Sequence, residues 1–263
     1  MEDTYWLPQT VDKALFDDIL WSKPEQKNQA GKLALIGGNS HGFNSVSEAY
    51  NSAVKAGVGV IRTFLPDSLS KTVSWIWPEC EYSPSTKIGS FSSKSLNDWL
   101  ALSDWADGVL ISGDLTHNSE TAILLERYLI NSAVQLTLSG DAVDIINESP
   151  QQILDKNNLT LACEIAQLQK LLIGIRYPTA VKSTMALRQL VDLLHSLTLN
   201  YPFAVITTHD GQAYVALAGK VSTTPIKTAS VCQAAAAATV WSLQHPAKKF
   251  DALTTAMFEI AIN

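Results

Sequence analysis

The sequence is poor in charge, and in positive charge above all. Of its 263 residues only 17% are Asp, Glu, Lys or Arg, and the net charge is −6 at pH 7. Such a chain has no broad basic surface to attract nucleic acid or an anionic membrane, so neither is expected as a partner. Hydrophobic residues make up 46% of the chain, which argues against disorder and predicts a folded core.

Cysteine is also scarce. Cys80, Cys163 and Cys232 lie far apart, which excludes a C-x-x-C metal or redox pair and a dense disulfide framework. The five histidines show no metal-binding spacing, so no metal site is predicted. The first eight residues lack the charged and apolar regions of a signal peptide, and no apolar run approaches the roughly 20 residues of a membrane span. We expect a cytoplasmic protein without membrane contact.

Short apolar runs alternate with segments of helical periodicity along most of the chain. Lys32–Ile36 ends at Gly37-Gly38 and is followed by a helical pattern over 45–57 and a second run over 58–65. Together they have the size of a right-handed βαβ unit. Further strands are expected at 108–111, 134–138, 158–161 and 203–207, the last forming a hairpin with 212–217. Further helices are expected at 94–102, 119–130, 164–172, 180–197, 229–243 and 250–262, with a short one after Asp141.

This alternation predicts an α/β fold, a three-layer α/β/α sandwich with a mainly parallel central sheet. No long linker and no internal repeat interrupts it. We therefore expect a single domain over residues 27–263, preceded by an N-terminal extension with a helix over 1–26.

Three motifs each allow two interpretations. The glycine-rich turn at 37–42 lies between a strand and a helix, so it either receives an anion or is an ordinary turn; its spacing fits neither G-x-G-x-x-G nor a P-loop. Asp141 either presents a carboxylate at the carboxyl edge of the sheet or caps the short helix after it. Without a basic patch nearby, Trp75-Ile76-Trp77 is interpreted as a buried aromatic anchor and not as a base-stacking platform.

The order of these segments resembles that of the ADP- or ATP-dependent NAD(P)H-hydrate dehydratases, which have the ribokinase-like fold. The similarity rests on Gly37-Gly38, on a helix that ends in Ala-Val-Lys-Ala-Gly-Val-Gly-Val at 53–60, and on Trp77-Pro78-Glu79. Segments 108–115, 139–143 and 159–168 resemble three later family motifs, which read G-P-G-L-G, D-A-D-A-L and L-T-P-H-x-x-E-x-x-R-L. The likeness extends from about Lys27 to the C-terminus and implies a ribokinase-like fold.

The resemblance implies ADP or ATP, with Mg²⁺, as ligand and hydrated NADH or NADPH as the family substrate, from which water is eliminated. In the family, the phosphates bind at a G-[ST]-G-D segment that begins a helix, and its Asp takes a proton. The matching stretch is Thr228 to Gln233, in which both glycines are replaced and Gln233 stands in place of the acid. A neutral amide cannot serve as a general base.

Other differences also weaken anion binding. The family L-K-G falls on Ile206-Thr207-Thr208 and loses its lysine, Asp114 puts negative charge where the family has glycine, and Asn44-Ser45 replaces a G-A pair. The His of T-P-H is absent as well. Among the family carboxylates, Asp141 remains.

The resemblance thus gives a set of candidate site residues. The catalytic candidates are Asp141 and Gln233, the latter at the degenerate position of the family acid. The candidates for binding the nucleotide are Gly37, Gly38, Asn44, Ser45, Gly113, Asp114, Thr207, Thr228, Ala229, Ser230 and Cys232.

Three hypotheses follow. The chain is a catalytically impaired or inactive homologue that binds a nucleotide or acts as a structural partner. Alternatively, it is an active dehydratase or small-molecule kinase in which Asp141 or Asp114 is the acid–base group and Lys227 or Lys220 supplies a cation. In the third hypothesis, the chain shares only the fold with the family and has an unrelated site for a small ligand. The resemblance also implies a homo-oligomer, and the apolar helices at 180–197 and 250–262 would lie either in its interface or in the core.

Overall fold

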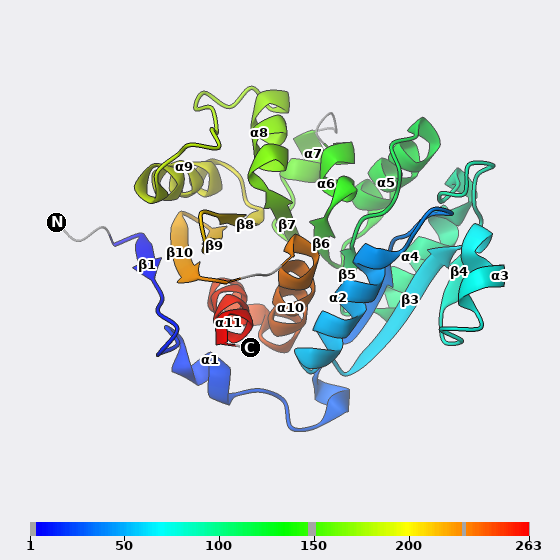
Figure 1. Cartoon of the computed structure of the whole chain (residues 1–263), viewed down its shortest axis with the longest axis horizontal. Coiled ribbons are helices and arrows are strands. Elements are labelled where there is room, and N and C mark those ends of the chain that lie inside the picture. Colours follow the sequence, from blue (N-terminus) through cyan, green and yellow to red (C-terminus); the bar gives the residue numbers. More distant parts are fainter. Residues whose placement is uncertain (1–3, 147–150, 228–229, 263) are drawn as a thin grey trace.

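A computed structural model describes residues 4–146, 151–227 and 230–262. These residues form a sheet of ten strands in the order β1-β10-β9-β8-β7-β6-β5-β2-β3-β4, with helices on both faces (Figure 1). Among the described strands, β9 alone runs opposite to the others. The strands are β1 (Trp6–Pro8), β2 (Lys32–Ile36), β3 (Val60–Pro66), β4 (Glu81–Ser83), β5 (Gly108–Ile111), β6 (Gln135–Ser139), β7 (Leu159–Glu164), β8 (Ala204–His209), β9 (Gln212–Leu217) and β10 (Lys220–Pro225).

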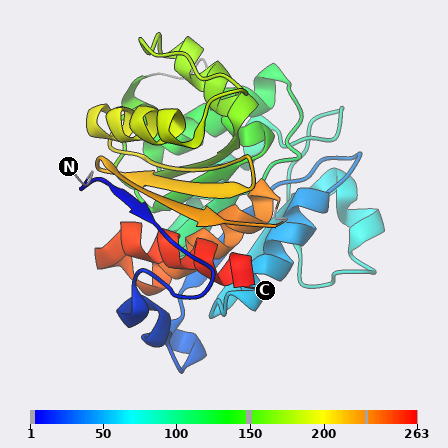
Figure 2. The same cartoon turned by 60° about the vertical axis from the view of Figure 1, so that its left-hand side comes forward.

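The helices cover the two faces of the sheet unequally. One face carries α2, α10 and α11, and the other carries α4 to α9 (Figure 2). The helices are α1 (Asp17–Trp21), α2 (Asn44–Lys55), α3 (Ser70–Val73), α4 (Leu96–Trp105), α5 (Ser119–Asn131), α6 (Asp141–Ile145), α7 (Gln151–Leu154), α8 (Ile165–Gly174), α9 (Leu187–Asn200), α10 (Val231–Gln244) and α11 (Lys249–Ile262). No helix among them is long and apolar enough to cross a membrane.

The central strands are buried on both faces, which explains their continuous apolar sequences. In β2, Leu33 and Leu35 point into the core under α2 and α10, while Ala34 and Ile36 point into the core under α4 and α5. The alanines at 234–238 have small side chains, so α10 packs closely against the sheet and against its neighbours α2 and α11. The predicted three-layer arrangement with a mainly parallel sheet is confirmed.

Several predicted boundaries and elements differ from the structure. The helix expected at 180–197 runs over Leu187–Asn200, and the hairpin at 203–217 continues into β10. Strands β1, β4 and β10 were not predicted, because two have three residues each and β10 is rich in Lys, Ser and Thr. The prediction of a buried aromatic anchor at 75–77 is wrong for two of its three residues, because Trp75 and Ile76 are 89% and 75% exposed. They follow the end of α3 and lie outside both cores, whereas Trp77 packs edge-on against Tyr50.

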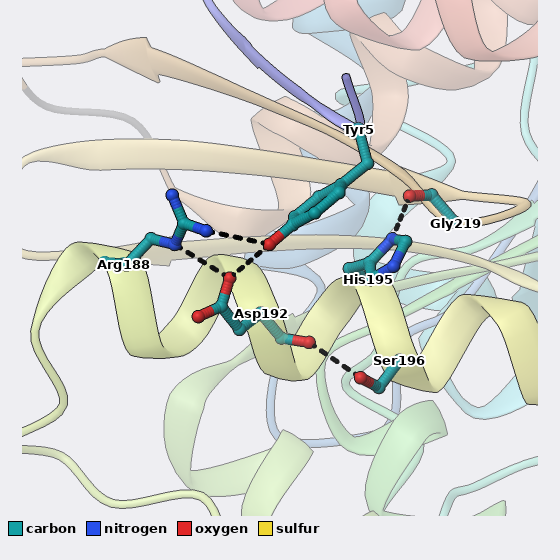
Figure 3. A network of polar contacts seen from close by, with 6 residues as sticks. All are labelled: Tyr5, Arg188, Asp192, His195, Ser196 and Gly219. Carbon is teal, nitrogen blue, oxygen red and sulfur yellow. Dashed lines mark hydrogen bonds and ion pairs between the residues drawn. The ribbon is translucent and has the colours of Figure 1, made fainter. Parts of the chain in front are cut away.

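The N-terminal segment joins the sheet at its far edge. β1 pairs in parallel with β10, with Trp6 opposite Val221. Just before it, Tyr5 stacks on His195 of α9 with ring centroids 3.8 Å apart (Figure 3). The Tyr5 hydroxyl donates to Asp192 Oδ1 (2.7 Å) and accepts from Arg188 Nη2 (2.9 Å), and His195 Nδ1 contacts the carbonyl oxygen of Gly219. These contacts attach the first strand to α9 and to the β9–β10 turn.

Candidate functional site

The predicted site residues gather at the carboxyl edge of the sheet. From β2 the chain proceeds outward through β3 and β4, then returns to the other side of β2 as β5. Beyond the contact of β2 with β5, the chain continues from β2 to α2 on one face of the sheet and from β5 to α5 on the other. Open α/β sheets bind ligands at such a switch point. Gly37 and Gly38 follow β2, Gly113 and Asp114 follow β5, and Asp141 follows β6.

The glycines at this edge are required by the packing of the loops on one another. Gly38 (φ +88°) donates its N–H to the carbonyl oxygen of Gly113 at 3.1 Å. A Cβ on Gly37 would lie 2.6 Å from that same oxygen. Gly113 has φ +103°, and a Cβ there would lie 3.2 Å from Asp141 Oδ1. Close approach of backbone to backbone thus accounts for these glycines without a ligand.

The carboxylate of Asp114, a residue of the loop after β5, lies at the N-terminal end of α2. Its backbone is left-handed (φ +58°), and its Oδ2 accepts a hydrogen bond from Ser45 N at 2.8 Å. Asn39 Nδ2 donates to the Asp114 carbonyl oxygen at 2.7 Å, which holds the loop after β2 against the loop after β5. A carboxylate at this position satisfies a free amide at the helix start and interacts favourably with the helix dipole. Asn44 begins the helix and is exposed.

Asp141 is bound to the neighbouring loop and does not cap its own helix. Its Oδ2 accepts from Leu115 N (2.8 Å) and Thr116 N (3.0 Å), whereas the residue that precedes α6 is Gly140. Asp141 Oδ1 is buried and has no hydrogen-bond partner among the described residues. Burial raises the pKa of Asp141 and outweighs the two amides, which lower it. The group is therefore a half-buried carboxyl whose Oδ1 is fully buried and unpartnered.

The start of α10 is satisfied by a capping box. Ser230 Oγ accepts from Gln233 N (3.2 Å), and Gln233 Oε1 accepts from Ser230 N (3.3 Å). Ser230 Oγ also donates to Glu48 Oε2 of α2 at 2.7 Å. The Gln233 side chain therefore turns back to its own helix end, where it also lines a groove of about 330 Å³ between α2, α10 and α11.

Cys232, one residue earlier, faces the strand ends. Its thiol donates to the carbonyl oxygen of Ser112 (3.3 Å), and Ser139 Oγ lies 3.9 Å from its sulfur. Burial raises the pKa of the Cys232 thiol, so at neutral pH it is protonated and is a poor proton acceptor. At the start of α10, Cys232 and not Gln233 is therefore the residue whose side chain faces the strand ends.

A hollow of about 610 Å³ lies farther along the same edge, beyond the ends of β7, β8 and β10. Thr208, Lys227 and Ser230 line it, together with Glu164 and His209. Thr207, one residue before Thr208, is buried within β8. Lys220, the other cation considered, begins β10 at the opposite edge of the sheet. Thr228 and Ala229 lie outside the described residues.

The structure thus places most of the predicted residues that it describes at one edge, in two groups, and places Gln233 in the groove between α2, α10 and α11. Gly37, Gly38, Gly113, Asp114 and Asp141 form the loop cluster, with Ser45 and Cys232 beside it; Ser230 and Thr207 belong to the side of the hollow. Glu48, which contacts the start of α10, was missed because the sequence gives no sign that α2 and α10 pack side by side. Within the described ranges, no group of three or more His, Cys, Asp or Glu side chains is arranged to hold a metal ion.

Several solved structures share this arrangement, and one of them is described as ribokinase-like. The chain is similar to a ribokinase-like superfamily protein from Enterococcus faecalis V583 (TM-score 0.69, 13% identity, covering 97% of this chain and 87% of that chain). It is also similar to a hypothetical protein from Streptococcus mutans (TM-score 0.71, 14% identity, 95% and 89%). A third is the ADP/ATP-dependent NAD(P)H-hydrate dehydratase from Bacillus subtilis co-crystallised with ATP and Mg²⁺ (TM-score 0.61, 11% identity, 90% and 80%).

At these identities the likeness establishes the fold, and the chain has the ribokinase-like fold that its sequence predicted. No protein-family model and no curated protein sequence matches the chain. The activity must therefore be argued from the site itself.

Proposed function

We propose that the chain is a ribokinase-like protein that does not carry out nucleotide-driven dehydration and that acts by binding a ligand at the carboxyl edge of its sheet or as a structural partner. The observation that carries this proposal is the position of Asp114. Its carboxylate is hydrogen-bonded to the N-terminal end of α2, where an anionic ligand would otherwise be received. A phosphate there would have to displace a like charge.

The start of α10 supports the same conclusion. In the resembled family this helix begins at the phosphates, but here Ser230 and Gln233 satisfy two of its end groups and the Glu48 carboxylate lies against Ser230. Of the two lysines considered as replacements, Lys220 lies at the opposite edge, which leaves Lys227. The described residues therefore fit the phosphates of a nucleotide poorly.

The start of α10 also has no side chain suited to accept a proton. Gln233 is an amide bound to its own helix end, and Cys232 is a thiol whose pKa is raised by burial. Neither takes a proton from a hydroxyl group at neutral pH. We infer that the family reaction is impaired at both phosphate binding and general-base catalysis.

The direct test is to incubate the purified chain with hydrated NADH and ADP or ATP plus Mg²⁺ and to follow NADH absorbance. We expect no turnover above a heat-inactivated control, and turnover would overturn the proposal. A thermal-shift series with ATP, ADP, AMP and NADH measures the remaining binding, because a ligand at 100 times its dissociation constant adds about 2.7 kcal/mol to the free energy of unfolding.

A variant without two of the carboxylates tests whether their negative charge opposes anion binding. Asp114→Asn combined with Glu48→Gln removes both carboxylates while retaining hydrogen-bond acceptors. We expect it to bind sulfate or ATP more tightly than the unmodified chain does. Asp107→Asn is the matched control, because Asp107 also accepts from a backbone amide, Lys32 N, but at the amino edge. Equal anion binding by all three proteins would show that the carboxylates do not block the site.

Asp141 favours a second candidate function, an active dehydratase or small-molecule kinase with a relocated acid–base group. Its buried, unpartnered Oδ1 and raised pKa are suited to proton transfer. If the unmodified chain shows turnover, Asp141→Asn should abolish it while the fold is preserved. The cytoplasmic location and the homo-oligomer that the resemblance implies stay predictions.

A further inference from the structure

A second hollow lies at the amino edge of the sheet, opposite the hollow at the carboxyl edge described above. It has a volume of about 590 Å³ and lies where the end of α9, the β9–β10 turn, the loop before β7 and the start of α11 meet. Helices α9 and α11 are on opposite faces of the sheet (Figure 2), so the hollow spans the sheet edge between them. Its apolar lining residues are Leu199, Tyr201, Pro202, Leu217 and Ala218.

One charged side chain, Lys249 of α11, lines this hollow. Its Nζ donates to the carbonyl oxygen of Leu159 at 3.2 Å and lies 3.5 Å from that of Asn157. An ammonium group has three N–H donors, so one is left over. The described residues offer Lys249 no carboxylate, unlike its neighbour Lys248, which pairs with Asp18 at 2.5 Å.

A partly buried ammonium without a counter-ion is unusual. Burial lowers the pKa of Lys249 to about 8, and no charged neighbour contributes to the shift. Carbonyl dipoles solvate such a group incompletely, and buried charges in proteins are generally paired. An anion entering the hollow would supply the missing charge and accept the remaining N–H.

The surroundings restrict the kind of anion. The hollow offers a single cation and mainly apolar walls, including Leu199, which is 63% exposed. One positive charge matches one negative charge, and the apolar walls match a hydrocarbon body better than a polyphosphate or a sugar. We propose that the amino-edge hollow is a binding site for a small amphipathic carboxylate, with its carboxylate on Lys249 Nζ and its apolar tail against Leu199, Tyr201 and Leu217.

The test compares octanoate with 1-octanol, a neutral probe of the same chain length, by isothermal titration calorimetry. The unmodified chain should bind octanoate at least about tenfold more tightly than octanol, because a hydrogen bond between charged groups is lost with the alcohol. Lys249→Met should remove this preference, and Lys248→Met, the neighbouring exposed lysine, should retain it. Equal affinities for the two probes, or an unchanged preference in Lys249→Met, would overturn the proposal.

A second measurement uses the unmodified sequence and does not depend on the folding of a variant. Reductive ¹³C-methylation makes each lysine amine visible by NMR, and the Lys249 signal is identified by its low titration midpoint. Octanoate should raise that midpoint and octanol should not, since only the carboxylate stabilises the charged amine. A midpoint that octanoate leaves unchanged would contradict the assignment of Lys249 as the binding group. Both measurements are independent of the carboxyl edge of the sheet and of the function proposed for it.

Discussion

At the residue scale, two carboxylates at the carboxyl edge accept hydrogen bonds from the chain's own backbone. Asp114 accepts from Ser45 N, and Asp141 accepts from Leu115 N and Thr116 N. Carboxylates used in this way hold loops together. They also keep a negative potential at the start of α2. The same residues therefore stabilise the packing of the loops and oppose the binding of an anion there.

Lys249 gives a prediction on the pH dependence of stability. Its pKa is about 8 in the folded chain against an ordinary value of 10.5. Between these values the unfolded chain binds more protons than the folded chain does, so the free energy of unfolding rises with pH over this interval. Below pH 8 the full cost of burying the charge remains. Lys249→Met should therefore be more stable than the unmodified chain at neutral pH, by on the order of 2 kcal/mol.

That difference should shrink as the pH increases from about 8 towards 10.5, because the folded lysine is then already neutral. Urea unfolding at a series of pH values measures it, with Lys248→Met as the control for losing an exposed charge. A stability difference that does not change with pH would show that Lys249 keeps an ordinary pKa.

At the scale of elements, the loops after β2 and β5 pack too closely for any side chain at Gly37. A Cβ there would lie 2.6 Å from the Gly113 carbonyl oxygen, which also accepts a hydrogen bond from Gly38 N. Gly37→Ala should therefore reduce the free energy of unfolding by about 2 kcal/mol or more. Gly42→Ala, in the same loop but with nothing within 4 Å of its added Cβ, should change it by no more than about 0.5 kcal/mol. Equal effects in urea unfolding would mean that this contact relaxes at little cost.

The attachment of β1 depends on Tyr5. Tyr5→Phe removes the hydroxyl bonds to Asp192 and Arg188 but keeps the ring on His195, so we expect a loss of about 0.5–1 kcal/mol. Tyr5→Ala also removes the stacking contact and should release the strand. Hydrogen exchange at Val221 N, which donates to the Tyr5 carbonyl oxygen at 2.8 Å, reports this release. It should accelerate in Tyr5→Ala and much less in Tyr5→Phe, while exchange at Val109 of β5 stays unchanged in both.

At the scale of the whole molecule, the sequence predicted the layers well and the edges poorly. Continuous apolar runs such as Lys32–Ile36 identify strands that are buried on both faces, and these are the central strands. Short or polar edge strands such as β1, β4 and β10 lack that signal. Their positions depend on pairing with strands far away in the chain, as for β1 and β10.

The same limit applies to the candidate site. The order of the motifs placed Gly37, Gly113 and Asp141 at one edge, because parallel strands end on the same side. It did not reveal that Asp114 binds the end of α2 or that Glu48 contacts Ser230. Those contacts join side chains to loops from distant segments, and no local spacing encodes them.

The pairing of β1 with β10 also bears on how the protein is made. Trp6 and its partner Val221 lie far apart in the chain, so Val221 is synthesised long after Trp6. At synthesis rates of about 5–20 residues per second, the first strand waits for roughly 10–40 s before its partner exists. During that interval the aromatic segment around Tyr5 and Trp6 is available to chaperones, and the sheet closes at this edge only after β10 has left the ribosome.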